Sequence, residues 1–141
     1  QYIAEDAYIE KSIIADGTEI YGKVYNSVIG AGVTIEEGAV VRDSIIMNNS
    51  VIGSNTVVNK AIIAEEVKVG SNVELGVGEE VENVKLPKIY NSGLVTIGEC
   101  SVIPDGVKVG KNTAISGETT LADYNNNELA SGGIIIKAGD N

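Results

Sequence analysis

The sequence predicts an all-β protein, a parallel β-helix of roughly six coils with one loop extruded from it. Three observations predict this fold. Aliphatic residues recur at every sixth position, Gly, Asn or Asp recurs three residues after them, and a small or β-branched residue follows one position later. A helix would need apolar residues at steps of three and four, and an antiparallel strand would alternate. A six-residue unit with its own corner instead builds a coil with three short, flat faces.

The repeat is clearest in four blocks that begin at residues 11, 26, 43 and 60 and read KSII, NSVI, DSII and KAII. Each block marks one coil. The step is six within each trio of aliphatic positions and shortens to five between trios, and after one interruption the step of six resumes. The aliphatic positions are Ile29, Ile35, Val41, Ile46, Ile52, Val58, Ile63, Val69 and Leu75, then Ile97, Ile103, Val109, Ile115 and Leu121.

Corners are predicted where Gly, Asn or Asp follows the aliphatic position, because these residues tolerate the positive φ of a tight turn. The interior is expected to be aliphatic, since a narrow triangular prism has no space for large rings and the chain has no Phe or Trp. The predicted corner residues are Asp6, Gly17, Gly32, Gly38, Asn49, Asn55, Asn72, Gly78, Gly106 and Asn112.

The chain divides into a β-helix over residues 1–122, with an extruded loop over 77–96, and a tail over 123–141. A loop of this length in a compact domain is unusual. Subunit contact, contact with a neighbouring domain and a solvated insertion are all open for it. The tail has a polar run over 124–128 and an apolar strand over 134–136. We expect it to cap the last coil, because an unpaired coil end invites edge-to-edge association.

Composition excludes several function classes. The chain has no His, which removes a His general base, a Ser/His/Asp triad and His-based metal sites. A net charge of -10 argues against nucleic acid as a partner, because phosphate binding needs Lys and Arg. No apolar run is long enough to span a membrane. A single cysteine, Cys100, forms no internal disulfide, so the cytoplasm is the expected compartment.

Basic residues are few, and four of them carry the candidate binding site. The first interpretation is structural: Asp43 and Lys60 form a surface ion pair of little energetic value, and Arg42 stacks on the ring of Tyr25, with which it lies in register. The alternative is that the four residues help to line an anion site shared with another domain, where charged hydrogen bonds to phosphate are strong. The candidate anion-binding residues are Lys11, Lys23, Arg42 and Lys60; no catalytic residue and no metal ligand is predicted.

Four of the six tyrosines fall in the first coils. Together with a start at Gln1, inside a patterned segment and without Met, they suggest a piece of a longer protein whose missing domain packed here. The residues predicted at this domain junction are Tyr8, Tyr21 and Tyr25.

The pattern resembles the hexapeptide repeat of left-handed β-helices over nearly the whole chain, and the left hand is taken from this resemblance. Acyltransferases and carbonic anhydrases of that fold depend on histidine, so neither activity is expected. Two longer runs, 37–47 and 92–97 followed by 102–106, resemble the C-terminal domain of bacterial glucose-1-phosphate adenylyltransferases. The opening QYI and the blocks NSVI and KAII add to this resemblance.

The resemblance implies a parent enzyme that makes ADP-glucose and pyrophosphate from ATP and glucose 1-phosphate, with Mg²⁺, for glycogen synthesis. Its chemistry would lie in an N-terminal nucleotidyltransferase domain whose motifs are absent here, so this chain is expected to need no cofactor and to be non-catalytic alone. The β-helix would supply homo-tetramer assembly and part of a regulatory site for phosphorylated metabolites. Lys60 fits that site, whereas Asn59 and Gly98 stand where some members have lysine.

Three readings remain: this regulatory and oligomerisation domain, the same domain on another sugar-nucleotide transferase or a non-catalytic regulatory paralogue, and a stand-alone structural or interaction β-helix. The sequence upstream of Gln1 would separate the stand-alone β-helix from the other two interpretations. A glycine-rich nucleotidyltransferase motif there would exclude a stand-alone protein.

Overall fold

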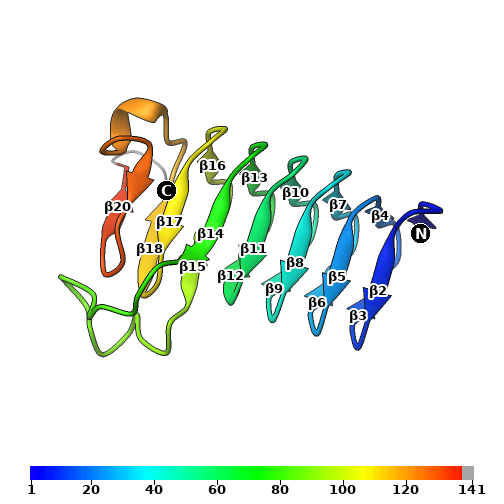
Figure 1. Cartoon of the computed structure of the whole chain (residues 1–141), viewed down its shortest axis with the longest axis horizontal. Coiled ribbons are helices and arrows are strands. Elements are labelled where there is room, and N and C mark those ends of the chain that lie inside the picture. The colour runs from blue at the N-terminus through cyan, green and yellow to red at the C-terminus, as the bar shows by residue number, and fades with distance from the viewer. Residues whose placement is uncertain (138–141) are drawn as a thin grey trace.

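The computed structural model describes residues 1–137 and confirms a parallel β-solenoid with three sheets (Figure 1). We call the sheets faces A, B and C. Face A contains β1 (Tyr2–Ile3), β4 (Glu19–Ile20), β7 (Thr34–Ile35), β10 (Val51–Ile52), β13 (Lys68–Val69) and β16 (Val102–Ile103). Face B contains β2 (Tyr8–Glu10), β5 (Lys23–Tyr25), β8 (Val40–Arg42), β11 (Val57–Asn59), β14 (Glu74–Val77), β17 (Lys108–Gly110) and β19 (Glu128–Leu129). Face C contains β3 (Ile13–Ile14), β6 (Val28–Ile29), β9 (Ile45–Ile46), β12 (Ala61–Ile63), β15 (Val95–Ile97), β18 (Thr113–Ser116) and β20 (Ile134–Ile136).

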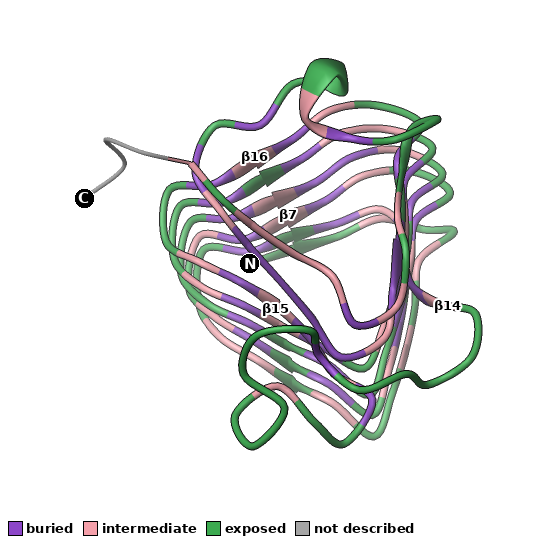
Figure 2. Ribbon diagram, turned by 90° about the vertical axis from the view of Figure 1, so that its left-hand side faces the viewer, coloured by how far each residue is buried: buried purple, intermediate pink, exposed green. Residues whose placement is uncertain are grey.

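Each coil visits faces A, B and C in turn, and every strand pairs in parallel with the strand one coil away. Ile35 pairs with Ile52, and Ile52 with Val69. With the C-terminal end toward the viewer, the chain runs clockwise from face A to face B to face C, so the coil is left-handed (Figure 2). Two faces have seven strands. The solenoid therefore has more coils than the roughly six expected, because the tail adds one.

The core is a stack of inward-facing aliphatic side chains. Ile20, Ile35 and Ile52 are 0% exposed on face A, and Val41 and Val58 are 0% exposed on face B. Burying an aliphatic side chain of this size stabilises the fold by about 1.5–3 kcal/mol. Because each layer rests only on its neighbours, the interior is continuous along the prism axis.

Most predicted corners are confirmed by positive φ angles. Gly17, Gly32, Gly38, Asn49, Asn55, Asn72, Gly78, Gly106 and Asn112 all have them, whereas Asp6 does not. Further corners carry residues that the sequence pattern did not mark. The corner between faces B and C is held by Lys11, Asn26, Asp43 and Lys60, with φ of 49°, 47°, 50° and 52°. Lysine at positive φ is uncommon because its Cβ crowds the backbone.

A ladder of serine hydroxyls lines the same corner. Ser12 Oγ accepts the amide N–H of Ser27 at 3.0 Å, Ser27 Oγ accepts that of Ser44 at 3.1 Å, and Ser44 Oγ accepts that of Ala61 at 3.1 Å. Each hydroxyl also donates to a carbonyl of its own coil, as Ser27 does to Tyr25 at 2.7 Å. The ladder thus satisfies buried amides between coils and stops at Ala61, which has no hydroxyl.

The chain leaves the solenoid over residues 78–94, between β14 and β15. Val77, Val95 and Thr96, expected in the loop, lie in these strands instead. The loop is anchored by Asn83, which is buried and donates from Nδ2 to the carbonyl of Asn112 at 2.9 Å, while its Oδ1 accepts the amide of Leu86 at 3.0 Å. Most other loop residues are exposed.

The tail forms a further coil at the C-terminal end of the solenoid. Leu121, expected in the repeat of inward aliphatics, instead begins the 3-10 helix η1 (Leu121–Asp123) and is 49% exposed. Strands β19 and β20 then pair in parallel with β17 and β18. Residues 138–141 of the expected tail lie outside the described residues.

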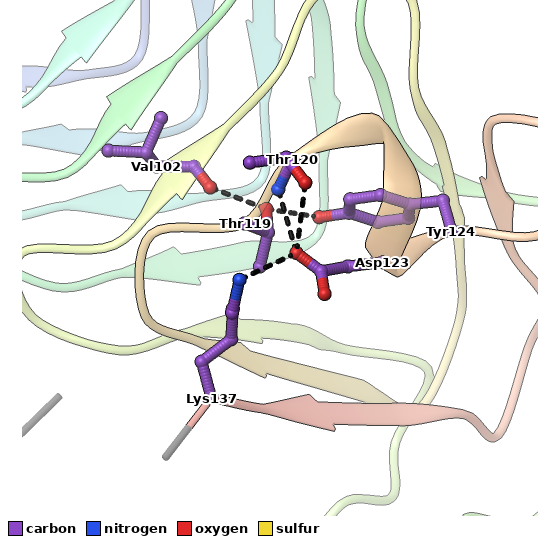
Figure 3. A network of polar contacts seen from close by, with 6 residues as sticks. All are labelled: Val102, Thr119, Thr120, Asp123, Tyr124 and Lys137. Atoms are coloured by element: carbon purple, nitrogen blue, oxygen red, sulfur yellow. Dashed lines mark hydrogen bonds and ion pairs between the residues drawn. The ribbon is translucent and has the colours of Figure 1, made fainter. Parts of the chain in front are cut away.

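Polar contacts close this last coil (Figure 3). Thr119 Oγ1 donates to the Val102 carbonyl at 2.6 Å, so the Tyr124 hydroxyl, 2.8 Å away, donates to Thr119 Oγ1. Asp123 Oδ2 accepts the Thr120 amide at 2.8 Å and Lys137 Nζ at 3.1 Å. Tyr124 thereby enters the core, which the aliphatic pattern did not predict.

Candidate functional site

The candidate site is a ladder of rings and charges on the outer surface of face B. Tyr25 lies one coil beyond Glu10 and one coil before Arg42 in the strand register. The Arg42 guanidinium carbon lies 4.2 Å from the centroid of the Tyr25 ring, which confirms the predicted stacking. The Tyr8 ring lies on the other side, with its centroid 5.5 Å from that of Tyr25. Stacking holds the guanidinium flat and leaves its N–H edge free to donate.

A hollow of about 440 Å³ opens beside this ladder at the corner between faces B and C. Two of the predicted anion-site residues, Lys11 and Arg42, line this hollow. Tyr25, Asn26 and Glu10 complete its lining. The cations are exposed, so an anion here would be held by hydrogen bonds from Arg and Lys in partial contact with water.

Glu10 sets the local electrostatics beside the rings. The Tyr8 hydroxyl donates to Glu10 Oε2 at 3.3 Å. The pKa of Tyr8 is raised above its usual value, first by the negative charge of Glu10 and then by this hydrogen bond. Tyr8 therefore stays neutral at physiological pH and acts as a stacking surface.

The other two predicted cations lie elsewhere. Lys23 lines a separate hollow of about 230 Å³ with Asp6, Tyr21 and Glu37. Lys60 lies at the corner column of Lys11, several coils away, and is exposed. The four residues therefore do not converge on one pocket within this chain.

The expected ion pair between Asp43 and Lys60 is wrong. Asp43 Oδ1 instead accepts the Nδ2 of Asn26 at 2.8 Å, from the coil on the other side. Among residues 1–137 the ion pairs are Lys108 with Glu74 at 3.6 Å and Lys137 with Asp123 at 3.1 Å. Corner side chains project outward from the prism, so a neighbour in the column is within reach only when the side-chain lengths match.

The predicted junction tyrosines form two groups. Tyr8 and Tyr25 pair on face B, whereas Tyr21 pairs with Tyr2 at a centroid distance of 5.6 Å. The Tyr21 hydroxyl donates to Glu19 Oε1 at 2.8 Å, and this hydrogen bond is the main cause of its raised pKa. Stacking follows from the coil step, which places side chains of adjacent coils about 4.8 Å apart.

Over residues 1–137, no cluster of three or more His, Cys, Asp or Glu residues is placed to hold a metal. The Cys100 thiol is exposed, and desolvation followed by the charges of Glu66 and Glu99 raises its pKa, which lowers its thiolate fraction. In the same described part of the chain, no helix has both the length and the apolar character needed to cross a membrane.

The chain is similar in sequence to one family model and to several curated enzymes. The family model described as GlmU-like, C-terminal hexapeptide matches residues 3–97. A glucose-1-phosphate adenylyltransferase of Lachnospira eligens is 86% identical over 141 residues, which is 100% of this chain and 33% of the relative. That of Acetivibrio thermocellus is 45% identical over 99% of this chain and 33% of the relative, and that of Thermotoga maritima is 52% identical over 96% and 32%. The chain thus spans about a third of the length of these curated relatives.

A solved structure supports the architecture alone. The acetyltransferase domain of PglB from Neisseria gonorrhoeae is 17% identical, with a TM-score of 0.55, over 97% of this chain and 51% of that one. At this level of identity the likeness concerns the fold and carries no activity across.

Proposed function

This chain belongs to the GlmU-like C-terminal hexapeptide family, and we propose that it is the regulatory and oligomerisation domain of a glucose-1-phosphate adenylyltransferase. The observation that carries the proposal is the 86% identity to such an enzyme over 100% of this chain but only 33% of the relative. A match that covers the whole of one chain and a third of the other is what a domain of that enzyme would give. The absence of His from the sequence agrees with an active site located elsewhere in the parent.

The parent protein would make ADP-glucose and pyrophosphate from ATP and glucose 1-phosphate, in the cytoplasm, for glycogen synthesis. The proposal includes an N-terminal catalytic domain that supplies the nucleotide site and the Mg²⁺ ligands. The β-helix would assemble the parent protein into a homo-tetramer and contribute part of its regulatory site. The exposed cations and tyrosine rings of face B are groups that can hold an anionic regulator.

The regulatory ligand would be an anion of the phosphorylated-metabolite class, held at the hollow beside Arg42. Arg42 is pre-oriented by Tyr25, and a planar guanidinium donates two parallel N–H groups to a phosphate. Lys11 adds a second charge at the same hollow. Lys11 and Arg42 line a hollow that is open on one side, and the catalytic domain would supply the rest of the pocket.

The test uses the whole parent enzyme. ADP-glucose formation is measured from ATP and glucose 1-phosphate with increasing inorganic phosphate or a sugar bisphosphate. Arg42→Ala is expected to raise the half-maximal effector concentration by about ten- to a hundredfold, because one charged hydrogen-bond pair contributes roughly 1.5–3 kcal/mol. The matched control is Lys108→Ala, a cation on the same face whose partner is Glu74, and its effector response should be unchanged.

Two outcomes overturn the proposal separately. If the whole protein forms no ADP-glucose, the adenylyltransferase assignment fails. If it forms ADP-glucose but Arg42→Ala and Lys108→Ala respond alike to effector, the regulatory site beside Arg42 fails while the enzyme assignment stands.

A further inference from the structure

The extruded loop contacts a coil that lies well beyond the one it leaves. It departs from the solenoid between β14 and β15, yet the amide of Val84 donates to the carbonyl of Gly132 at 2.8 Å, in the corner between β19 and β20. Figure 1 shows the loop running along the prism axis from β14 toward the last coil. The coil of β16, β17 and β18 lies between these two places, so the loop spans it from the outside.

Asn83 fastens the outgoing part of the loop. Its side chain is buried, and its Nδ2 donates to the carbonyl of Asn112 at 2.9 Å and to that of Gly133 at 3.3 Å. These two carbonyls belong to consecutive coils. The Oδ1 of Asn83 accepts the amides of Lys85 and Leu86, both at 3.0 Å, which shapes the turn of the loop. One side chain therefore holds the loop, the coil that it crosses and the last coil together.

Asn112 fastens the loop from the coil that is crossed. Its side chain is also buried, its Oδ1 accepts the amide of Gly93 at 2.7 Å, and its Nδ2 donates to the carbonyl of Val81 at 3.1 Å. Val81 precedes the tip of the loop and Gly93 follows it, so both ends of the loop are held. Buried amide groups that are fully hydrogen-bonded fix one arrangement, because any other would leave them unpaired.

The last coil has a glycine where the loop crosses it. Gly132 has a φ of 81°, and a side chain at this position would meet the carbonyl oxygen of Glu82. Gly106 gives the contrast: it has a φ of 76°, and nothing lies within 4 Å of a Cβ placed on it. Gly106 therefore serves its turn alone, whereas Gly132 serves both a turn and the close approach of the loop.

The last coil has fewer neighbours than the coils in the middle of the solenoid. Strand β8 pairs with β5 on one side and β11 on the other, whereas β19 and β20 end their sheets and pair only with β17 and β18 within residues 1–137. In a stack of repeats each unit is stabilised by its neighbours, so a terminal coil opens more easily than an internal one. The bonds from the loop to Gly132 and Gly133 therefore add to a small number of contacts.

We propose that the extruded loop is a strap that keeps the last coil closed on the solenoid. The loop and the last coil detach and close again as one unit, while the coils before β14 stay folded. The inference is independent of the proposed enzyme activity, because it rests on contacts within residues 1–137.

Detachment would uncover the outer edges of β17 and β18. It would also open one side of the core layer that contains Val109 and Ile115, which are 0% and 1% exposed in the closed state. Uncovered strand edges invite unwanted pairing. The strap thus protects this end of the solenoid.

Native-state hydrogen exchange of the 141-residue chain, followed by NMR in low concentrations of urea, is the first test. Amides that open in one event share one opening free energy and one urea dependence. The amides of Val84 and Gly93 in the loop should share both with the amides of Gly132 and Lys137 in the last coil. Amides of β7 and β10 should open only in global unfolding.

Asn83→Asp is the variant that releases the strap. The substitution keeps the oxygen that accepts the amides of Lys85 and Leu86, but it replaces the Nδ2 donor by an oxygen that faces two carbonyls. The turn of the loop is kept and its link to the last coil is lost. Exchange at Val84, Gly132 and Lys137 should accelerate by one common factor of about ten or more, while β7 and β10 keep their rates.

Asn91→Asp is the matched control in the same loop. Asn91 is exposed, and its Nδ2 donates to the carbonyl of Lys88 at 2.9 Å, within the tip of the loop. The variant adds the same charge to the same segment but breaks no bond to the last coil. Exchange at Gly132 and Lys137 should therefore stay as in the wild type.

Three results would overturn the strap. Faster exchange at Val84 without a change at Gly132 and Lys137 would mean that the loop opens alone. Equal acceleration in every coil, or an Asn83→Asp chain that does not fold, would mean that the loop belongs to the global folding unit. Unchanged exchange in Asn83→Asp would mean that the last coil closes without the loop. ADP-glucose formation by the parent enzyme is measured separately, so its failure and the failure of the strap are distinguishable.

Discussion

The coils before the extruded loop and those after it are held together differently. Before the loop, register runs unbroken through β4, β7, β10 and β13, and the inward-facing residues of these strands are all aliphatic. Where β14, the last strand before the loop, pairs with β17 beyond it, the register shifts between Leu75 and Val77, and in the last coil Tyr124 joins the aliphatic core. Both regions bury aliphatic side chains, but the loop and the last coil depend in addition on a few specific hydrogen bonds, such as those of Asn112 and Thr119. Substitutions should therefore act through packing in one region and through single hydrogen bonds in the other.

The largest effect is expected from a cavity in the regular region. Ile52→Ala removes a side chain that is 0% exposed and packed between two coils, so the free energy of unfolding should fall by about 2–5 kcal/mol. Urea unfolding followed by circular dichroism measures it. A loss below about 1 kcal/mol would mean that the coils repack freely around the gap, contrary to a close-packed interior.

A smaller and local effect is expected at the loop. Asn112 Oδ1 accepts the Gly93 amide at 2.7 Å, and its Nδ2 donates to the Val81 carbonyl at 3.1 Å. Asn112→Ala should cost about 1–3 kcal/mol, because buried partners lose their hydrogen bonds. Hydrogen exchange should accelerate at Gly93 while amides of β7 and β10 keep their protection.

The control for this variant is Asn59→Ala, on the outer surface of face B. It should leave exchange in the loop unchanged. Equal acceleration throughout the chain in Asn112→Ala would show that loop and coils unfold as one unit, and the contrast between the two regions would fail.

A gain in stability is expected at a strained corner. Lys60 has a φ of 52°, and Asn, which occupies the equivalent corner at Asn26, tolerates this conformation better. Lys60→Asn should raise the free energy of unfolding by about 0.5–1 kcal/mol, measured by urea unfolding at dilute concentration. Lys68→Asn, within strand β13, should not stabilise. A destabilising Lys60→Asn would show that the lysine side chain itself supports the coil.

The smallest effect concerns acid pH and the last coil. The Thr120 amide, and then Lys137, lower the pKa of Asp123 below its usual value. A lowered folded-state pKa gives stability that is present above the unfolded pKa near 3.8 and is lost as the pH falls through the folded value. Asp123→Asn should therefore flatten the acid limb of the stability curve for η1 and β20. An unchanged acid limb would mean that other carboxylates control it.

The regular region was predictable because its determinants are local. The spacing of Gly, Asn and aliphatic residues dictates corners and inward positions, and the strand register follows that spacing from Ile20 to Leu75. Leu121 fitted the same spacing and was misplaced, because a hydrogen-bond network of Thr119, Asp123 and Tyr124 overrides the hydrophobic step there. Nothing in a six-residue period encodes such a network.

The site was predictable only in part. Register alone gave the contact between Arg42 and Tyr25, since both lie at the same position of adjacent strands. The pairing of Asp43 with Asn26 was missed, because side-chain reach between corners depends on conformations that spacing does not specify. The serine ladder was also missed, although Ser at the second place of three of the four aligned blocks was its visible signal.

The end of the serine ladder at Ala61 has a consequence for how this molecule tolerates changes of length. At Ser27 and Ser44 an inserted residue would separate a hydroxyl from the amide it serves in the next coil. At this corner Ala61 has no hydroxyl to reach forward, and the next coil is joined there by the backbone bond from the Val95 amide to the Lys60 carbonyl at 3.0 Å. The extruded loop leaves the solenoid at this same corner, between β14 on face B and β15 on face C. A foreign peptide or a tag spliced into residues 84–91 should therefore leave the coils intact, whereas the same splice beside Ser44 should break the stack.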